Sequence, residues 1–347
     1  MKSEPALERQ EFNTKSPYNL MNNNIRNGFH ILVLLVMVIL IDNIIGMSMR
    51  VIFSKQESGA LSRTLYAMDS TTAEILIFGA SRANHHYNTS IFRKKLPEYT
   101  NYNCGNDGSS IFYHYSILRT ILNRYTPETI ILDIGPGAFS KNQGSYDKLS
   151  YLLPFIHNHP DIREVVHLKS SHERIKLLSK VYPYNSLLLS IVGGILNIHS
   201  NDNISDDGFV ALSGEWSGEL AIDSSRALYP IDNNKVKYFE TFIEICHNAG
   251  VNVIVTCSPR YLNKLYTDSS LKLVQEITNR KKVIFYNYSS DTSYLNDRSL
   301  FRDIAHLNAK GAAKYTEEII KRIFEDDSLQ MELFIIEDDF VKSIIEK

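Results

Sequence analysis

The chain has 347 residues, 44% of them hydrophobic, which is enough for one large α/β domain or two small ones. A formal net charge of −2 without a long basic run argues against a nucleic acid as partner, because phosphate backbones are bound by clustered cations. The cysteines lie far apart in or beside apolar stretches, a pattern typical of buried thiols and not of a disulfide framework or zinc site: Cys104, Cys246 and Cys257.

The N-terminal region predicts a membrane anchor. Residues 1–30 are polar and rich in Asn, which indicates a disordered tail, and residues 31–49 are mostly apolar over about the length that spans a bilayer. Asp42 interrupts this stretch, so we expect it near an interface, paired with a partner, or at the end of a shorter hydrophobic region. A cleaved signal peptide is the main alternative. The long polar leader and the lack of a small-residue cleavage pattern favour an uncleaved anchor.

Residues 50–72 are predicted to form a juxtamembrane linker helix, and a hydrolase-type domain is predicted over residues 73–325. Within this domain, short β-branched runs alternate with amphipathic helical patterns. The predicted strands are 75–78, 100–103, 130–134, 251–256 and 283–288, and the predicted helices are 111–124, 236–248, 271–280 and 309–324. This alternation predicts an α/β fold with a parallel sheet, right-handed crossovers and a site at the carboxyl ends of the strands.

Residues 141–230 break the alternation and are interpreted as a largely helical insertion. Such a long extra segment either caps or flanks the site, or forms a helical packing module without contact to substrate. Residues 326–347 carry acidic clusters and are predicted to form a C-terminal tail or helix.

Three short motifs at predicted strand ends carry chemistry. Gly79 and Ser81 follow the first strand, where a sharp turn exposes the serine hydroxyl at the sheet edge. Asp303 precedes His306 by three residues, a spacing that lets the carboxylate hold one ring nitrogen while the other accepts the serine proton. Gly105 follows the second strand, where a backbone N–H can enter an oxyanion hole. Each motif alone is also typical of an ordinary turn, helix cap or surface histidine. The prediction of a shared catalytic site therefore depends on the order of the three motifs and on their position at strand ends.

In these motifs the chain resembles the SGNH, or GDSL-type, serine hydrolase superfamily, and in particular its membrane-anchored envelope members related to alginate O-acetylation and teichoic-acid D-alanyl transfer proteins. The resemblance implies a flavodoxin-like three-layer α/β/α sandwich and carboxyl-ester chemistry without a metal or other cofactor. It implies Ser81 as nucleophile, His306 as general base and acid, and Asp303 as the residue that orients His306. The backbone N–H groups of Ser81 and Gly105 are then the oxyanion donors.

The sequence departs from this family at the third block. The family's Gly-x-Asn-Asp block supplies an asparagine side chain to the oxyanion hole, whereas this chain has Gly137 there. Losing one such donor removes on the order of 3 kcal/mol of transition-state stabilisation. The candidates for a replacement donor or a substrate contact are Arg82, Asn84, Asn106 and Arg260. Two histidine pairs, His85 with His86 and His157 with His159, lack supporting acidic or cysteine partners, so no metal site is predicted.

The expected function is an esterase or O-acyltransferase that acts on acyl esters, acetyl above all, of a cell-envelope polysaccharide. The expected partners are that acylated glycan, a membrane-bound acyltransferase and the membrane itself, with no nucleic acid. The resemblance places the protein in a bacterial cytoplasmic membrane, single-pass, with its catalytic domain on the periplasmic or extracellular side. The alternative is a catalytically degenerate scaffold or glycan-binding component of a polysaccharide-modifying complex. A membrane-tethered protease or thioesterase is a third, less favoured class.

Overall fold

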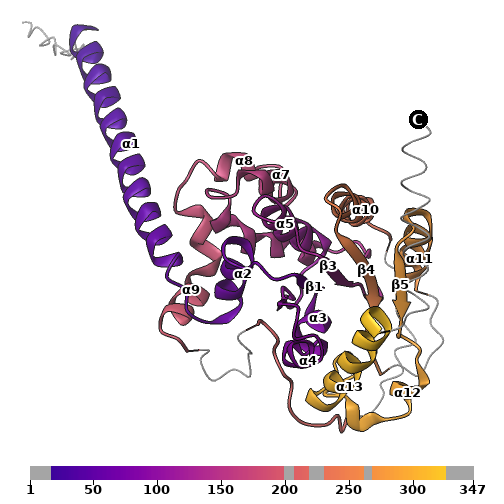
Figure 1. The fold of residues 1–347 in the computed structure, drawn as a ribbon. Helices are drawn as coiled ribbons and strands as arrows, with labels where there is room; N and C mark the ends of the chain where they lie inside the picture. Colours follow the sequence, from indigo (N-terminus) through magenta and orange to yellow (C-terminus); the bar gives the residue numbers. More distant parts are fainter. Residues whose placement is uncertain (1–16, 199–206, 219–229, 262–267, 326–347) are drawn as a thin grey trace, which may run out of the picture.

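The computed structural model describes residues 17–198, 207–218, 230–261 and 268–325, so the predicted C-terminal segment 326–347 lies outside the described residues. Its centre is a parallel sheet of five strands in the order β2-β1-β3-β4-β5 (Figure 1). The strands are β1 (Ile75–Gly79), β2 (Asn101–Asn103), β3 (Thr129–Asp133), β4 (Asn252–Cys257) and β5 (Ile284–Asn287). The five predicted strands are therefore confirmed, with bounds that differ by at most one residue at each end.

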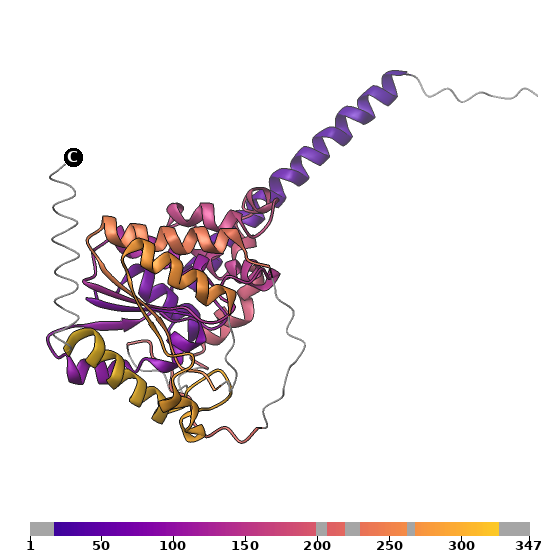
Figure 2. The same cartoon turned by 90° about the vertical axis from the view of Figure 1, so that its right-hand side faces the viewer.

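Alternating side chains of the strands build two hydrophobic cores, one on each face of the sheet. Leu76 and Phe78 of β1 join one core, and Ile75 and Ile77 join the other. The first face is covered by α5 (Ile111–Leu122), α10 (Asn233–Asn248) and α11 (Ser269–Lys281). The second face is covered by α3 (Ser81–His86), α4 (Thr89–Lys95), α12 (Thr292–Leu295) and α13 (Ala309–Ile320). The predicted three-layer α/β/α sandwich is confirmed, and Figure 2 shows the sheet between its two helical layers.

The strand order places a topological switch point between β1 and β3. From β1 the chain crosses outward to β2, and from β3 it continues in the opposite direction to β4 and β5. In open parallel sheets of this flavodoxin-like order, ligands bind outside the carboxyl ends of the two strands at such a point. The segments after β1 and β3 are Ala80–Ser81 and 134–139, so these residues border the expected site.

A single long helix, α1 (Pro17–Phe53), extends away from the domain (Figure 1). Among the described residues it is the one helix long and apolar enough to cross a membrane, by length and composition.

The prediction of a disordered tail over 1–30 is wrong for residues 17–30. Extending an existing helix fixes one residue for each hydrogen bond gained and so needs no new nucleus, which accounts for this longer helix. Residues 1–16 lie outside the described residues.

Helix α1 is fixed to the domain through Asp42. The Ser179 hydroxyl donates to its carboxylate at 2.5 Å, and the backbone N–H of Lys180 does so at 2.7 Å. About two turns further along α1, the Arg50 guanidinium donates to Asn158 Oδ1 at 2.7 Å. The Asp42 carboxylate is therefore paired. Pairing is one of the three placements expected for it, because an unpaired carboxylate inside a bilayer is costly.

The segment after α1 corrects a predicted boundary. Residues 50–72 were expected to be a linker, but α2 (Gly59–Asp69) packs into the domain core through Leu61, Ala67 and Met68. These apolar residues recur at helical spacing and so form one buried face. The α/β domain therefore begins near residue 59, not at residue 73.

The insertion over 141–230 has two described parts with different surroundings. Its first part contains α6 (Gln143–Asp147), α7 (Arg163–His167), α8 (Glu173–Lys176), α9 (Leu188–Ile195) and the 3₁₀-helices η1 (Lys148–Phe155), η2 (Pro160–Ile162) and η3 (Tyr182–Leu187). Buried residues such as Leu152, Phe155 and Val166 join the core on the α5 side. Its second part, 207–218, passes beside the carboxyl ends of the strands. The first part packs into the core, and the second part hydrogen-bonds to Asn103 at the end of β2 and to Asn84 in α3.

Candidate active site

The turn after β1 presents Ser81 as the first residue of α3. Gly79 has φ +146°, a conformation that L side chains rarely adopt, and a Cβ there would lie 2.7 Å from both Ala83 Cβ and the Asp133 carbonyl oxygen. The position therefore requires glycine. Because the first N–H groups of a helix have no partner within it, the Ser81 N–H is an open donor next to its own hydroxyl, and no other described residue accepts from it.

The structure brings the three predicted triad residues together from opposite ends of the domain. His306 Nε2 lies 2.7 Å from Ser81 Oγ, and His306 Nδ1 lies 3.0 Å from both carboxylate oxygens of Asp303. Asp303 Oδ1 also accepts the backbone N–H groups of Ala305 and His306, at 2.8 and 3.0 Å. Desolvation raises the pKa of Asp303, but the hydrogen bonds from His306 and the Ala305 N–H outweigh it and hold the pKa below its usual value. A charged Asp303 favours the tautomer in which Nδ1 carries the proton and Nε2 is free to accept one.

His86 positions the turn that carries His306. Its Nε2 accepts the backbone N–H of Leu307 at 2.9 Å, which leaves Nδ1 as the protonated nitrogen, 2.9 Å from the Ser258 hydroxyl. The ring is fully buried, and desolvation, with the charge of Arg82 beside it, lowers the pKa of His86 well below its usual value. No local pattern around His86 indicates this role, because the residue that it contacts lies 221 positions further along the chain.

A second polar network lies beside the triad and includes two residues that sequence reasoning missed, Arg63 and Asp107. The Arg63 guanidinium donates to Asn84 Oδ1 at 2.5 Å, and Asn84 Nδ2 donates to Asp107 Oδ1 at 2.7 Å. His85 lies 3.3 Å from Asp107 and 2.7 Å from the Val210 carbonyl oxygen. The His85 ring meets the His306 ring edge-on, with centroids 5.7 Å apart. The network thus ties the insertion segment 207–218 to the Ser81 helix.

The predicted role of Gly105 as an oxyanion donor is not supported. Its backbone N–H donates to Asn103 Oδ1 at 2.8 Å. The other side of the same amide, Asn103 Nδ2, donates to the carbonyl oxygens of Ala83 and Tyr87. The Gly105 N–H is therefore committed to a side chain that braces the turn against α3, and the residue serves the packing of the loop.

Of the four candidate replacement donors, Asn84 and Asn106 are committed elsewhere. Asn84 Nδ2 is bonded to Asp107 at 2.7 Å, and Asn106 is buried with its side chain close enough to the Tyr113 hydroxyl to influence the pKa of that group. Arg260 follows β4, and the N–H of the next residue, Tyr261, donates to the Ile304 carbonyl oxygen, which places this loop beside the Asp303–His306 turn.

Arg82, the remaining candidate, lies at the switch point. Its Nε donates to Asp133 Oδ1 at 3.3 Å, and its guanidinium fills the space above Gly135, where a Cβ would lie 1.3 Å from Nη2. Burial disfavours its charge, but Asp133 more than compensates and raises the pKa of Arg82. Its two terminal nitrogens make no hydrogen bond to another described residue. Arg82 therefore retains free donors next to the block where the family carries its asparagine.

Among the described residues, no group of three or more His, Cys, Asp and Glu side chains is arranged to hold a metal ion. The two histidine pairs instead make ordinary contacts: His159, for example, lies 2.6 Å from an Asp69 carboxylate oxygen. The three cysteines are buried free thiols.

Buried neutral histidines predict a loss of stability in acid. Burial lowers the pKa of His114 to about 3, so the unfolded chain binds a proton below a pH of about 6.5 that the folded chain does not bind. The free energy of unfolding should therefore fall as the pH drops, by about 2 kcal/mol at a pH of about 5 for this residue alone. Urea unfolding of the full chain at neutral and acidic pH measures the loss. His114→Phe should lose less than the wild type, and an identical loss in both would contradict the prediction.

Comparisons with known proteins leave the family open. No protein-family model matches the chain, and the comparison with curated proteins gives no match. Among solved structures, the chain is similar to LAE5, an alpha/beta hydrolase enzyme from the metagenome of Lake Arreo, Spain. The TM-score is 0.37 and the identity 8%, over 73% of this chain and 96% of that one. A likeness at this level carries no inference about activity.

Proposed function

We propose that the protein is a membrane-anchored SGNH-type serine esterase or O-acyltransferase. One observation carries the proposal: a serine at a strand-to-helix turn, a histidine 2.7 Å from its hydroxyl, and a carboxylate 3.0 Å from the other ring nitrogen. This is the relay of nucleophile, base and orienting acid that recurs on unrelated folds, and geometry identifies it better than sequence position does.

The relay supports acyl transfer in two steps. His306 Nε2 takes the proton of Ser81 Oγ while the oxygen attacks the ester carbonyl, and Asp303 stabilises the imidazolium that forms. His306 then returns the proton to the leaving alcohol oxygen, which yields an acyl-Ser81 ester. Water or a sugar hydroxyl attacks this ester in turn, with His306 again as the base. Hydrolysis and O-acyl transfer therefore differ only in the acceptor that reaches Ser81.

The developing oxyanion needs donors, and two groups at the turn can provide them. The Ser81 N–H is open at the start of α3, and the terminal nitrogens of Arg82 have no other described partner. A cationic donor is stronger than a neutral amide, which compensates for the asparagine that Gly137 replaces.

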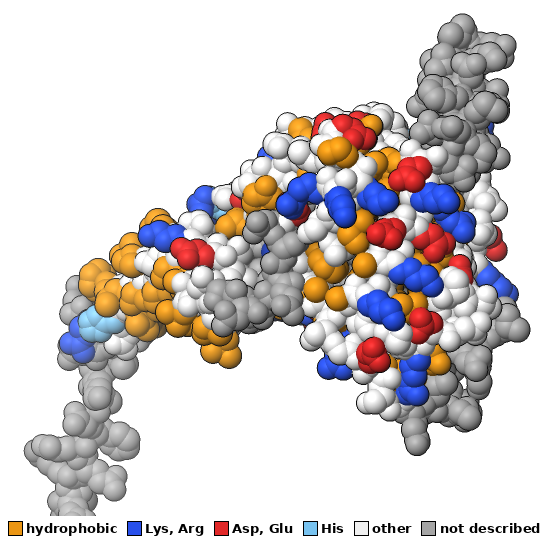
Figure 3. All heavy atoms as spheres, turned by 60° about the horizontal axis from the view of Figure 1, so that its bottom comes forward, with side chains coloured by type: hydrophobic (Ala, Val, Ile, Leu, Met, Phe, Trp, Pro, Cys, Tyr) orange, Lys and Arg blue, Asp and Glu red, His pale blue; other side chains and the backbone are white. Residues whose placement is uncertain are grey.

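The membrane anchor is supported by the surroundings of α1. Figure 3 shows the helix with a nearly continuous hydrophobic surface, whereas the domain carries interspersed charges. Where α1 meets the domain, α9 and the residue after it expose further apolar side chains, among them Leu189 at 90% and Leu196 at 66%. These residues extend the apolar surface of the helix onto the domain, and the contacts of Asp42 tie the two together. An uncleaved anchor therefore accounts for the arrangement better than a removed signal peptide does. The resemblance to envelope proteins favours the domain lying outside the cytoplasm.

A cell-envelope polysaccharide is the proposed substrate class. The support is by analogy: a small soluble ester has no need of a tethered enzyme, and the envelope members that the motifs resemble act on polymers. A membrane-bound acyltransferase is the partner that would deliver an acyl group to such a protein.

A catalytically degenerate scaffold or glycan-binding component is the second candidate. It is favoured by the commitment of the Gly105 N–H to Asn103 and by Gly137 in the third block. Both remove oxyanion donors on which the family relies.

A fluorophosphonate probe tests the proposal directly. It should label the full chain in detergent, because the activated Ser81 hydroxyl attacks phosphorus as it attacks an ester carbonyl. Ser81→Ala should abolish labelling, and Ser90→Ala, which changes an exposed serine on α4, should leave it intact. Equal labelling of the wild type and Ser81→Ala would rule out Ser81 as the nucleophile.

A further inference from the structure

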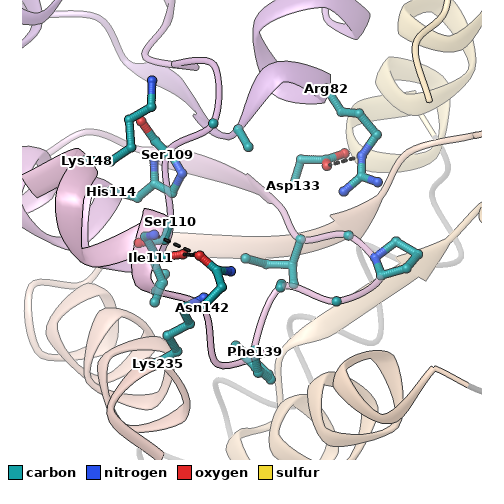
Figure 4. Close-up of a pocket in the computed structure, with 18 of the residues that line it drawn as sticks. Arg82, Ser109, Ser110, Ile111, His114, Asp133, Phe139, Asn142, Lys148 and Lys235 are labelled. Atoms are coloured by element: carbon teal, nitrogen blue, oxygen red, sulfur yellow. Dashed lines mark hydrogen bonds and ion pairs between the residues drawn. The ribbon is translucent and has the colours of Figure 1, made fainter. Parts of the chain in front are cut away.

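A cavity of about 390 Å³ lies beside the Ser81 turn at the switch point of the sheet. Figure 4 shows the residues that line it. They come from the turn after β1, the segment 134–139 after β3, the start of α5, η1 and α10. Ala80 and Arg82, which precede and follow Ser81 in the chain, form part of the wall, whereas Ser81, Asp303 and His306 do not line the cavity, so a group bound here adjoins the Ser81 turn.

The charges that line this cavity are mostly positive. Three cationic side chains line it, Arg82, Lys148 and Lys235, against one carboxylate, Asp133. The carboxylate is already committed, because it accepts from Arg82, from the Tyr87 hydroxyl at 2.8 Å and from the Ser258 N–H at 3.0 Å. The two lysines therefore have no counter-charge inside the cavity.

Lys235 is the most unusual of these groups, since it is 1% exposed. Its ammonium donates one hydrogen bond, to the Ser140 carbonyl oxygen at 2.7 Å. No carboxylate among the described residues lies within ion-pair distance of it, and the charge of Asp232 acts on it only from farther away. Fully buried lysines are rare unless paired, so two unused N–H groups next to a cavity point to an anionic ligand. Lys148 lies across the cavity with its ammonium 4.8 Å from the centre of the Tyr151 ring.

Two neutral donors complete the wall. Helix α5 begins at the cavity, and its N-cap Ser110 makes no side-chain cap hydrogen bond, which leaves the first N–H groups of the helix open. His114, one turn into α5, is 2% exposed and lines the cavity, and its Nδ1 has no partner among the described residues. A polar atom buried without a partner costs free energy, and a bound ligand would satisfy it.

We infer that this cavity is an anion subsite that holds a carboxylate or phosphate group of the substrate while its ester lies at Ser81. The inference rests on the proposed function and sharpens it: the polysaccharide is acidic, with the negative group on the acylated sugar or on its neighbour. Lys235 and Lys148 bind the anionic oxygens, and the start of α5 and His114 supply further hydrogen bonds. A neutral glycan would leave Lys148 and the two unused N–H groups of Lys235 without an anionic partner inside the cavity.

Binding is tested without turnover, in full-length Ser81→Ala protein in detergent. Calorimetric titrations use glucuronate as the carboxylate, glycerol phosphate as the phosphate, and glucose as the neutral control. One or both anions should bind and glucose should not, and the preferred anion tells a uronic-acid polymer from a phosphate polymer. Adding Lys235→Met or Lys148→Met should weaken anion binding by about tenfold or more, as expected for loss of a charge-assisted hydrogen bond. Lys141→Met, an exposed lysine outside the cavity, should leave binding unchanged.

The outcomes separate this inference from the proposed function. Anion binding that Lys235→Met and Lys148→Met both weaken supports the subsite, whatever the fluorophosphonate probe does. No binding by either anion, or binding that neither variant changes, overturns the subsite even if Ser81 is labelled. If the probe labels the wild type, Lys235→Met and Lys148→Met in unlabelled enzyme with Ser81 intact should raise KM for an acetylated acidic oligosaccharide, whereas Lys141→Met should leave this KM unchanged.

Discussion

His306→Ala turns over p-nitrophenyl acetate more slowly than the wild type by about 100-fold or more, the range that a positioned general base contributes. The reason is geometric, since His306 Nε2 is the base within reach of Ser81 Oγ, at 2.7 Å. Without it the hydroxyl keeps its proton and attacks poorly. Steady-state release of p-nitrophenolate by the full chain in detergent measures the effect.

A matched variant separates the base from a general effect of losing a histidine. His157→Ala removes an exposed histidine between η1 and η2, in the first part of the insertion, and should keep wild-type turnover. Ser81→Ala combined with His306→Ala should be no slower than either change alone, because the two residues act as a unit. If wild type and His306→Ala release p-nitrophenolate at the same rate, the scaffold function is the correct one.

Asp133→Ala lowers the free energy of unfolding by about 3–5 kcal/mol, the loss expected when one partner of a buried ion pair is removed. The carboxylate is 3% exposed at the end of β3, and it accepts from Arg82, Tyr87 and the Ser258 N–H. The change leaves a buried guanidinium without its counter-charge and the Ser258 N–H without an acceptor, and the Tyr87 hydroxyl loses one of its partners. Urea unfolding of the full chain, followed by far-ultraviolet circular dichroism, gives the difference.

Two controls fix the cause of this loss. Asp133→Asn keeps an acceptor but removes the charge, so it should destabilise the protein less than Asp133→Ala. Glu98→Ala removes an exposed carboxylate, and its effect should stay within about 0.5 kcal/mol. A loss below about 1 kcal/mol for Asp133→Ala would mean that the pair contributes little and that Arg82 is held by other contacts.

Local sequence patterns predicted the sheet because its strands are buried on both faces. Runs such as Ile75–Phe78 are short, β-branched and bounded by turn residues, and these features do not depend on distant contacts. The strand-end rule then placed Ser81 and the Asp303–His306 turn on one edge, and the distances agree with that placement. Helix α2 was mistaken for a linker because its apolar face is short and adjoins the anchor.

The remaining parts of the site depend on contacts between residues far apart in the chain. Nothing near Gly105 indicates that the Asn103 side chain takes its N–H, and nothing near Arg63 indicates that it reaches Asn84. The support that His86 gives to Leu307 joins residues 221 positions apart. Such hydrogen bonds follow from the packed fold, so single-residue patterns carry no trace of them.

The hydrogen bonds from Ser179 and Lys180 to Asp42 have a mechanical consequence for the proposed membrane-anchored protein. These hydrogen bonds fix the orientation of the domain relative to α1, so the domain does not rotate freely about the helix. In Figure 1, α3 and α13 lie at the end of the molecule opposite the N-terminal end of α1. In the proposed membrane-anchored protein, the start of α3, which carries Ser81, is then held at a fixed distance from the bilayer. We expect a polymer strand to react only where it passes Ser81 at this distance from the bilayer. The length of α1 and its contacts with the domain set that distance.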